Sequence, residues 1–209
     1  EITSTDPGFP RDAAAWCNST GNQLISKETA GGKSVVVIEK GEPKSCNIVT
    51  SCEGKGKTFI MFSDDLDKAL ATFVLANGAA ATGQKVTIFF TFWGLNVIKK
   101  LHKPNVEKDI FGKMFGMMLP SSSRKLKLSK MSMGGIGGKM MRYIMNRKGI
   151  DSLESLRQQA LENGVEFIAC QMSMDVMGVK QEELLDEVTI GGVATYMERA
   201  DNANINLFI

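Results

Sequence analysis

From Lys57 onward, short apolar runs alternate with amphipathic helical stretches, and this alternation restricts the fold more than any other feature. The apolar runs at 58–62 and 86–92 are typical of strands buried on both faces. Between them, apolar side chains in 66–74 repeat at helical spacing. Strand–helix–strand units of this kind pack as parallel sheets between layers of helices. The sequence therefore predicts an α/β fold with a three-layer, mostly parallel sheet.

The expected helix after the first strand has recognisable ends. Ser63 is expected to be its N-cap, and the aspartates that follow complement the helix dipole. Val74 is expected on the buried stripe, and Gly83 is expected to end the helix. A second well-marked helix is predicted to begin with Asp151 as N-cap and Glu154 completing a capping box.

The rest of this region continues the alternation. A glycine-dense stretch at 131–139 is expected to be mobile. The other expected elements are helices at 107–119, 140–148 and 192–200, a short helix near 181–185, and strands at 165–169, 188–190 and 205–209.

The chain is expected to divide into two parts. Residues 1–40 suggest a small α+β piece, with a strand, a helix at 9–19 and a hairpin over 22–40. So few residues cannot bury a self-sufficient core. Turn-forming residues at 41–56 predict a linker, and 57–209 is the larger domain. The first residue is not Met, which suggests a fragment or a processed product.

A scarcity of ligating side chains restricts the chemistry. His102 is the single histidine, so His-rich zinc sites are excluded and any His-based catalytic dyad must use that ring. The four cysteines are too far apart for a CxxC pair and too few for a disulfide scaffold in a chain of this length, so we expect free thiols and a reducing cytoplasmic location. No cofactor is expected. No signal peptide and no apolar run long enough to span a bilayer is visible.

Ligands of parallel sheets bind beyond the carboxyl ends of the strands, where three segments are expected to meet. Cys170 directly follows one strand there, with Gln171 after it, and could act as a nucleophilic thiolate or be a buried structural cysteine. Asp64 and Asp65 follow another strand and could position a substrate or only complement a helix dipole. Trp93 could form a pocket wall or pack in the core.

Positive charge is concentrated in one segment. Residues 111–149 hold nine basic and no acidic residues, together with many of the methionines. Such a surface could bind an anionic or variable partner. The glycines at 134–138 lack the spacing of a phosphate loop, and a single basic patch in a nearly neutral chain argues against nucleic acid.

Four long stretches resemble the DsrE/DsrF/DsrH-like family, in its DsrE-like or peroxiredoxin-like branch. They are residues 62–83, 86–100, 125–141 and 164–179. Residues 6–22 are similar to the second half of a TusA/SirA-like sulfur-carrier domain, although the Cys-Pro-x-Pro motif of that family is absent. The combination also looks like the C-terminal part of coenzyme A-disulfide reductase-like flavoproteins.

The resemblance implies a flavodoxin-like fold, homo-oligomers and sulfur transfer through Cys170 to and from partner proteins or small thiols. In that hypothesis Cys170 holds a persulfide, with Asp64, Asp65, Trp93 and Gln171 around it. One alternative is an accessory domain for reducing coenzyme A disulfide, persulfide or polysulfide. In that domain, basic side chains would bind the phosphates, namely Lys125, Lys127 and Lys130. Another is a non-enzymatic module whose basic, Met-rich segment docks on a membrane surface or a partner helix.

Overall fold

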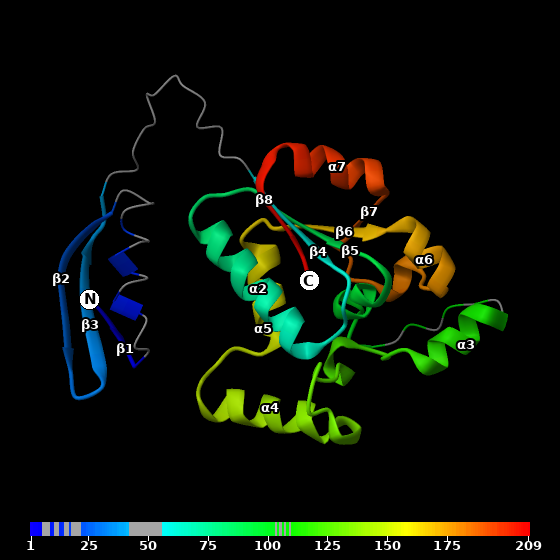
Figure 1. Cartoon of the computed structure of the whole chain (residues 1–209), viewed down its shortest axis with the longest axis horizontal. Coiled ribbons are helices and arrows are strands. Elements are labelled where there is room, and N and C mark those ends of the chain that lie inside the picture. The colour runs from blue at the N-terminus through cyan, green and yellow to red at the C-terminus, as the bar shows by residue number, and fades with distance from the viewer. Residues whose placement is uncertain are drawn as a thin grey trace. The chain divides into compact units, whose positions relative to one another are not determined.

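The computed structural model of the chain describes residues 1–5, 9, 10, 13, 14, 17, 22–41, 56–102, 104, 106, 108 and 110–209. The chain divides into two compact units, Glu1–Glu53 and Gly54–Ile209 (Figure 1). Cys46, Cys52 and nearly all of the expected linker lie outside the described residues.

The first unit contains a three-stranded antiparallel sheet. Its strand order is β1-β3-β2, and its strands are β1 (Ile2–Ser4), β2 (Gln23–Ala30) and β3 (Lys33–Glu39). Gly31 and Gly32 form the hairpin turn with positive φ angles, a conformation that favours glycine. Of the helix predicted at 9–19, the described residues are helical, and Cys17 is buried.

The second unit contains a five-stranded sheet in which every pairing is parallel, in the order β7-β6-β5-β4-β8. The strands are β4 (Gly56–Met61), β5 (Val86–Phe90), β6 (Glu166–Cys170), β7 (Thr189–Gly191) and β8 (Ala203–Phe208). The helices are α2 (Leu66–Ala81), α3 (Ile110–Met118), α4 (Ile136–Arg147), α5 (Leu153–Glu162), α6 (Gln171–Met177) and α7 (Val193–Asp201). Short 3₁₀ segments lie at Phe92–Ile98, Ser123–Lys125, Met133–Gly135 and Gln181–Glu183.

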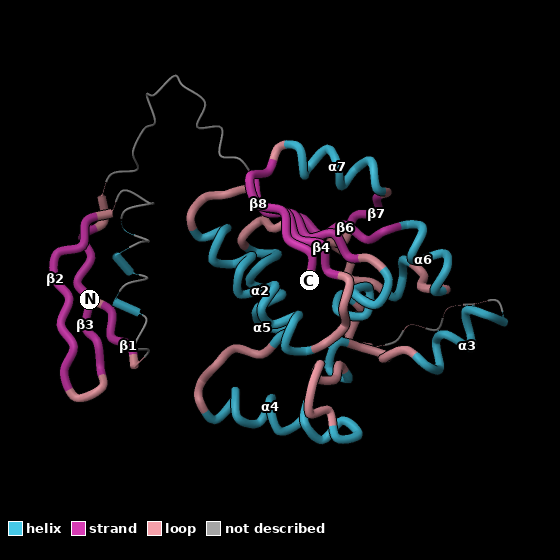
Figure 2. Tube along the Cα trace, in the orientation of Figure 1, coloured by secondary structure: helices cyan, strands magenta, loops and turns pink. Residues whose placement is uncertain are grey.

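Helices cover both faces of this sheet (Figure 2). Helices α2 and α5 pack on one face, where the rings of Phe73, Phe90 and Phe167 meet at centroid distances of 5.3 to 6.5 Å. Helix α7 lies on the opposite face (Figure 1). The predicted three-layer α/β architecture with a parallel sheet is therefore confirmed.

Two predicted helix starts are wrong by one or two residues. The N-cap of α2 is Asp65, because the Ser63 hydroxyl accepts a hydrogen bond from the Asp65 N–H at 3.2 Å before the helix begins. The N-cap of α5 is Ser152, whose hydroxyl accepts from the Ser155 N–H at 3.1 Å. Glu154 does not close a capping box there, because its carboxylate bonds to neighbouring elements instead.

Two further expectations fail because packing overrides the local pattern. Val74 faces solvent, since the sheet-facing side of α2 runs through Phe73 and Ala76 instead. The helix expected at 140–148 begins earlier, at Ile136, inside the glycine-dense stretch 131–139. Gly137 is buried there, and an added Cβ would lie 2.1 Å from the Met131 carbonyl oxygen. Gly137 therefore allows the two backbones to approach closely.

Candidate functional site

Cys170 lies at the edge of the sheet where the sequence places it. It is the last residue of β6, it is the N-cap of α6, and it pairs in register with Gly191 of β7. Side chains alternate along β6, so Phe167 and Ala169 belong to the core beneath α2 and α5. Ile168 and Cys170 therefore face the side that carries α7.

The Cys170 side chain is covered. The residue is 2% exposed and clusters with Phe89 and Ile168, and Tyr196 of α7 packs against this cluster. Of the two interpretations of Cys170, a nucleophilic thiolate and a buried structural cysteine, the burial seen in this conformation agrees with the second. The physical reason is that α6 follows β6 without an intervening loop and α7 crosses the same face.

Helix α7 contacts the sheet through an arginine–carboxylate pair and one aromatic ring. None of its residues is fully buried. Arg199 binds the Glu166 carboxylate at the start of β6 through two hydrogen bonds of 2.9 and 3.1 Å, and Thr87 donates to the same carboxylate at 2.9 Å. The hydrogen bond from Arg199 holds the pKa of Glu166 below its ordinary value. Tyr196 adds a ring contact with Phe89 at a centroid distance of 5.2 Å.

Asp64 follows β4 at the same edge, where burial disfavours the negative charge of its carboxylate. Burial raises its pKa above the ordinary carboxyl value, although the Asn96 amide donates a hydrogen bond to it at 3.0 Å. Asn96 is fully buried, and its Oδ1 has no hydrogen-bond partner in the described part of the chain. Trp93 is 43% exposed nearby in sequence, so the core-packing interpretation does not hold for it.

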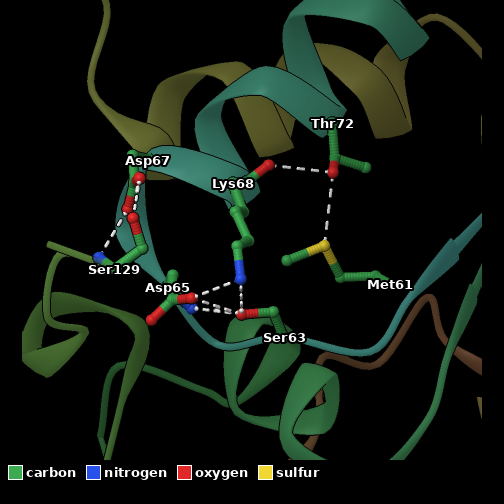
Figure 3. A network of polar contacts seen from close by, with 7 residues as sticks. All are labelled: Met61, Ser63, Asp65, Asp67, Lys68, Thr72 and Ser129. Carbon is green, nitrogen blue, oxygen red and sulfur yellow. Dashed lines mark hydrogen bonds and ion pairs between the residues drawn. The ribbon is translucent and has the colours of Figure 1, made fainter. Parts of the chain in front are cut away.

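Asp65 belongs to a network that organises the start of α2 (Figure 3). Ser63 Oγ donates to Asp65 Oδ2 at 2.7 Å, and Lys68 Nζ lies 2.8 Å from the same carboxylate oxygen. Gln171, the residue after Cys170, is exposed and donates to Asp175 at 2.9 Å within α6. These contacts of Asp65 and Gln171 therefore join residues that are close in sequence.

The three lysines expected to bind an anion lie away from the thiol. Lys125, Lys127 and Lys130 are all exposed. Their segment is bound to the start of α2, where the Leu66 N–H donates to the Lys127 carbonyl at 2.7 Å. The Ser129 N–H also donates to the Asp67 carboxylate at 2.9 Å (Figure 3). This is the α2 side of the sheet, whereas Cys170 faces the α7 side. The arrangement does not favour phosphates held by these lysines beside the thiol.

Several residues at this edge are not recognisable from the sequence pattern. Thr91 and Ser173 form a buried hydroxyl pair at 2.8 Å beside the ends of β5 and β6. Phe92 has a φ of 47°, which is strained for a residue with a side chain. Tyr196 of α7 packs on the cluster around the thiol, and Arg199 of the same helix binds Glu166 at the other end of β6.

The described residues offer neither a group of metal-binding side chains nor a membrane-spanning helix. Among them, no group of three or more His, Cys, Asp or Glu side chains could hold a metal ion. No helix in the described part of the chain has the length and apolar character needed to cross a bilayer.

The raised pKa of Asp64 predicts a pH-dependent effect on stability. The native state holds the Asp64 proton more tightly than the unfolded chain does, so this carboxyl destabilises the fold as the pH rises through its pKa. Asp64→Asn stays neutral and still offers an acceptor to Asn96. We expect its urea midpoint to exceed that of the wild type at neutral pH and the difference to shrink at acidic pH. A difference that is the same at both pH values would contradict the assignment.

Comparison with known proteins identifies the family of the second unit. The pattern of the DsrE/DsrF/DrsH-like family matches residues 54–208. The chain is 44% identical over 155 residues to the uncharacterised protein YrkE of Bacillus subtilis, covering 74% of this chain and 97% of that protein. It is 38% identical over 161 residues to a protein of Allochromatium vinosum named sulfur carrier protein DsrE2, covering 75% and 99%.

A solved structure is also similar. The crystal structure of the YchN protein from E. coli aligns with a TM-score of 0.42 and 10% identity over 74% of this chain and 99% of that one. The family assignment rests on the sequence matches, which span most of this chain and nearly all of both relatives. The chain therefore belongs to the DsrE/DsrF/DrsH-like family.

Proposed function

We propose that the second unit is a sulfur-relay domain that carries sulfane sulfur as a persulfide on Cys170. One observation carries the proposal: Cys170 is the single cysteine in residues 54–208, the region matched by the family, and it ends a parallel strand at the ligand-binding edge. The similarity to a protein named as a sulfur carrier supports the same chemistry. The TusA/SirA-like interpretation of residues 1–40 and the likeness to coenzyme A-disulfide reductases remain predictions.

The proposed step is a thiol–persulfide exchange. The Cys170 thiolate attacks the outer sulfur of a donor persulfide, forming a new S–S bond. The S–S bond of the donor breaks, and its inner sulfur leaves as a thiolate. That thiolate takes up the proton that the Cys170 thiol lost when it ionised. In the second exchange an acceptor thiolate attacks the outer sulfur of the Cys170 persulfide, and Cys170 leaves as a thiolate. No net oxidation or reduction occurs, so the relay needs only donor and acceptor thiols as partners.

Burial of the thiol defines what else the relay requires. Because Cys170 is covered by Tyr196 and its cluster, exchange needs a conformation in which α7 moves off this face of the sheet. A helix with no fully buried residue is a low-stability element that can open locally. In this view Glu166 and Arg199 set how often the thiol is available, and the partner that delivers sulfur engages the opened form.

Sulfur loading tests the proposal directly. The full chain is incubated with glutathione persulfide and its thiols are then alkylated, so that peptide mass spectrometry can assign the added sulfur to each cysteine. We expect one added sulfur on the peptide that contains Cys170 and complete loss of that signal in Cys170→Ser.

A matched control removes the other thiols. A variant with Cys17, Cys46 and Cys52 replaced by serine keeps Cys170 alone and should load like the wild type. Sulfur found only on the peptides of Cys46 or Cys52, in a wild-type chain with intact circular dichroism, would overturn the proposal. Because that result comes from the unmodified protein, misfolding of a variant cannot produce it.

A further inference from the structure

Helix α4 turns apolar side chains to solvent instead of toward the core. Ile136 is 65% exposed, Met140 47% and Tyr143 62%. At about 100° per residue, these three side chains lie within about 60° of one another on one side of the helix. We call them the α4 apolar face. The opposite side of the helix packs on the unit through three buried residues, namely Gly137, Gly138 and Met145.

The turn before α4 extends this surface at the expense of backbone strain. Met131 and Met133 are both mostly exposed, and both have positive φ angles, 58° and 43°. This region of backbone conformation is unfavourable for residues with a side chain. The Met131 carbonyl packs close to Gly137 of α4, while the two flexible apolar side chains stand in solvent. Such an arrangement indicates a contact outside the unit.

Unpaired cations surround the α4 apolar face. Lys139 lies on its flank, and Arg147 and Lys148 lie at the C-terminal end of the helix, all three exposed. In the described ranges, no carboxylate forms an ion pair with any of them. Arg142 differs, because it points inward and binds Glu154 at 3.0 Å. The whole stretch 111–149 contains no acidic residue.

We propose that the α4 apolar face binds the surface of a lipid bilayer rich in anionic headgroups, with α4 lying in the plane of the interface. Ile136, Met140 and Tyr143 enter the boundary between headgroups and acyl chains, while Lys139 and Arg147 meet the lipid phosphates. The binding is peripheral, because no described helix could cross the membrane. Outside 111–149 the chain carries 23 acidic against 16 basic residues, so repulsion orients the other surfaces away from the bilayer.

The same charges argue against the other occupants. Two copies meeting through this face would bring their cations together without intervening carboxylates, which costs energy. Met140 on the face and the two exposed methionines of the preceding turn are flexible side chains that fit a deformable interface, and the neighbouring basic residues match anionic headgroups. Vesicle binding distinguishes the bilayer from an apolar groove on another protein.

Vesicle flotation of the full chain tests the proposal. We expect binding to vesicles of phosphatidylcholine and phosphatidylglycerol in equal amounts, and little binding to phosphatidylcholine alone. The double substitution Ile136→Asp with Met140→Asp should lower the bound fraction at least about tenfold. Lys139→Glu and Arg147→Glu should each lower it about fivefold, with a matching sensitivity to salt.

Three comparisons make the outcome decisive. Val74→Asp alters an apolar side chain of similar exposure on α2 and should bind like the wild type. Cys170→Ser should also bind normally, because this inference is independent of the sulfur chemistry. Equal binding to neutral vesicles, or undiminished binding by folded Ile136→Asp/Met140→Asp, would overturn the proposal. So would a dimer in analytical ultracentrifugation that this double variant dissociates, since a second copy would then occupy the face.

Discussion

Truncating Tyr196 to alanine should make the Cys170 thiol react about tenfold faster with iodoacetamide. The Tyr196 ring packs on the cluster that contains Cys170 and contacts the Phe89 ring at 5.2 Å. Loss of the aromatic pair and its buried area destabilises the closed state relative to the open state by on the order of 1.4 kcal/mol. That change corresponds to a factor of ten in the population of the open state. Alkylation at Cys170 is followed over time by peptide mass spectrometry in the intact protein.

Met197→Ala is the matched control for this experiment. Met197 is the next residue of α7, it is exposed, and in the described part of the chain it does not belong to the cluster around the thiol. Its truncation should leave the alkylation rate of Cys170 unchanged. Equal rates in Tyr196→Ala and the wild type would mean that the thiol opens by another route, for example through α6, and the role assigned to α7 would fall.

A second large effect is expected at the turn after β5. Gly94→Ala should lower the free energy of unfolding by about 3 kcal/mol, because an added Cβ would lie 1.9 Å from the Met61 carbonyl oxygen. The Gly94 N–H also donates to the Phe62 carbonyl at 2.8 Å, so the backbone there cannot shift without losing that bond. Urea unfolding followed by circular dichroism measures the change.

Gly78→Ala serves as the opposite control. Gly78 lies in α2, it is exposed, and an added Cβ would meet nothing within 4 Å. Alanine there should raise stability by about 0.5–1 kcal/mol, since it has the better helix propensity. If both substitutions shifted the urea midpoint in the same direction, close packing of Gly94 against β4 would not be the property that matters.

The Gly94 contact also positions the candidate site. It brings the 3₁₀ segment Phe92–Ile98 directly against the end of β4. That segment supplies Asn96, which binds Asp64, and Trp93, which remains exposed. A charged carboxyl kept partly buried beside an unsatisfied amide oxygen lowers stability, and such features are common at functional sites.

Local patterns predicted most of the fold. The apolar runs at 58–62 and 165–169 correspond to β4 and β6, and the break at Gly83 ends α2 as expected. These signals survive because strand burial and glycine turns depend mainly on the residues themselves. The errors, such as the N-cap at Ser63, occur where contacts from distant segments decide the exact residue. There the Leu66 N–H binds the Lys127 carbonyl rather than a local cap.

What the sequence alone determined is the class of fold and the edge at which Cys170 lies, because both follow from the alternation of strands and helices along the chain. Only the tertiary structure decided that the thiol is covered by Tyr196 and that Lys125, Lys127 and Lys130 lie on the other side of the sheet. Hydrophobic periodicity records whether a residue is buried, but not which distant side chain buries it. That choice is made by the packing of α7 and of the segment before α4 onto opposite faces of the same sheet.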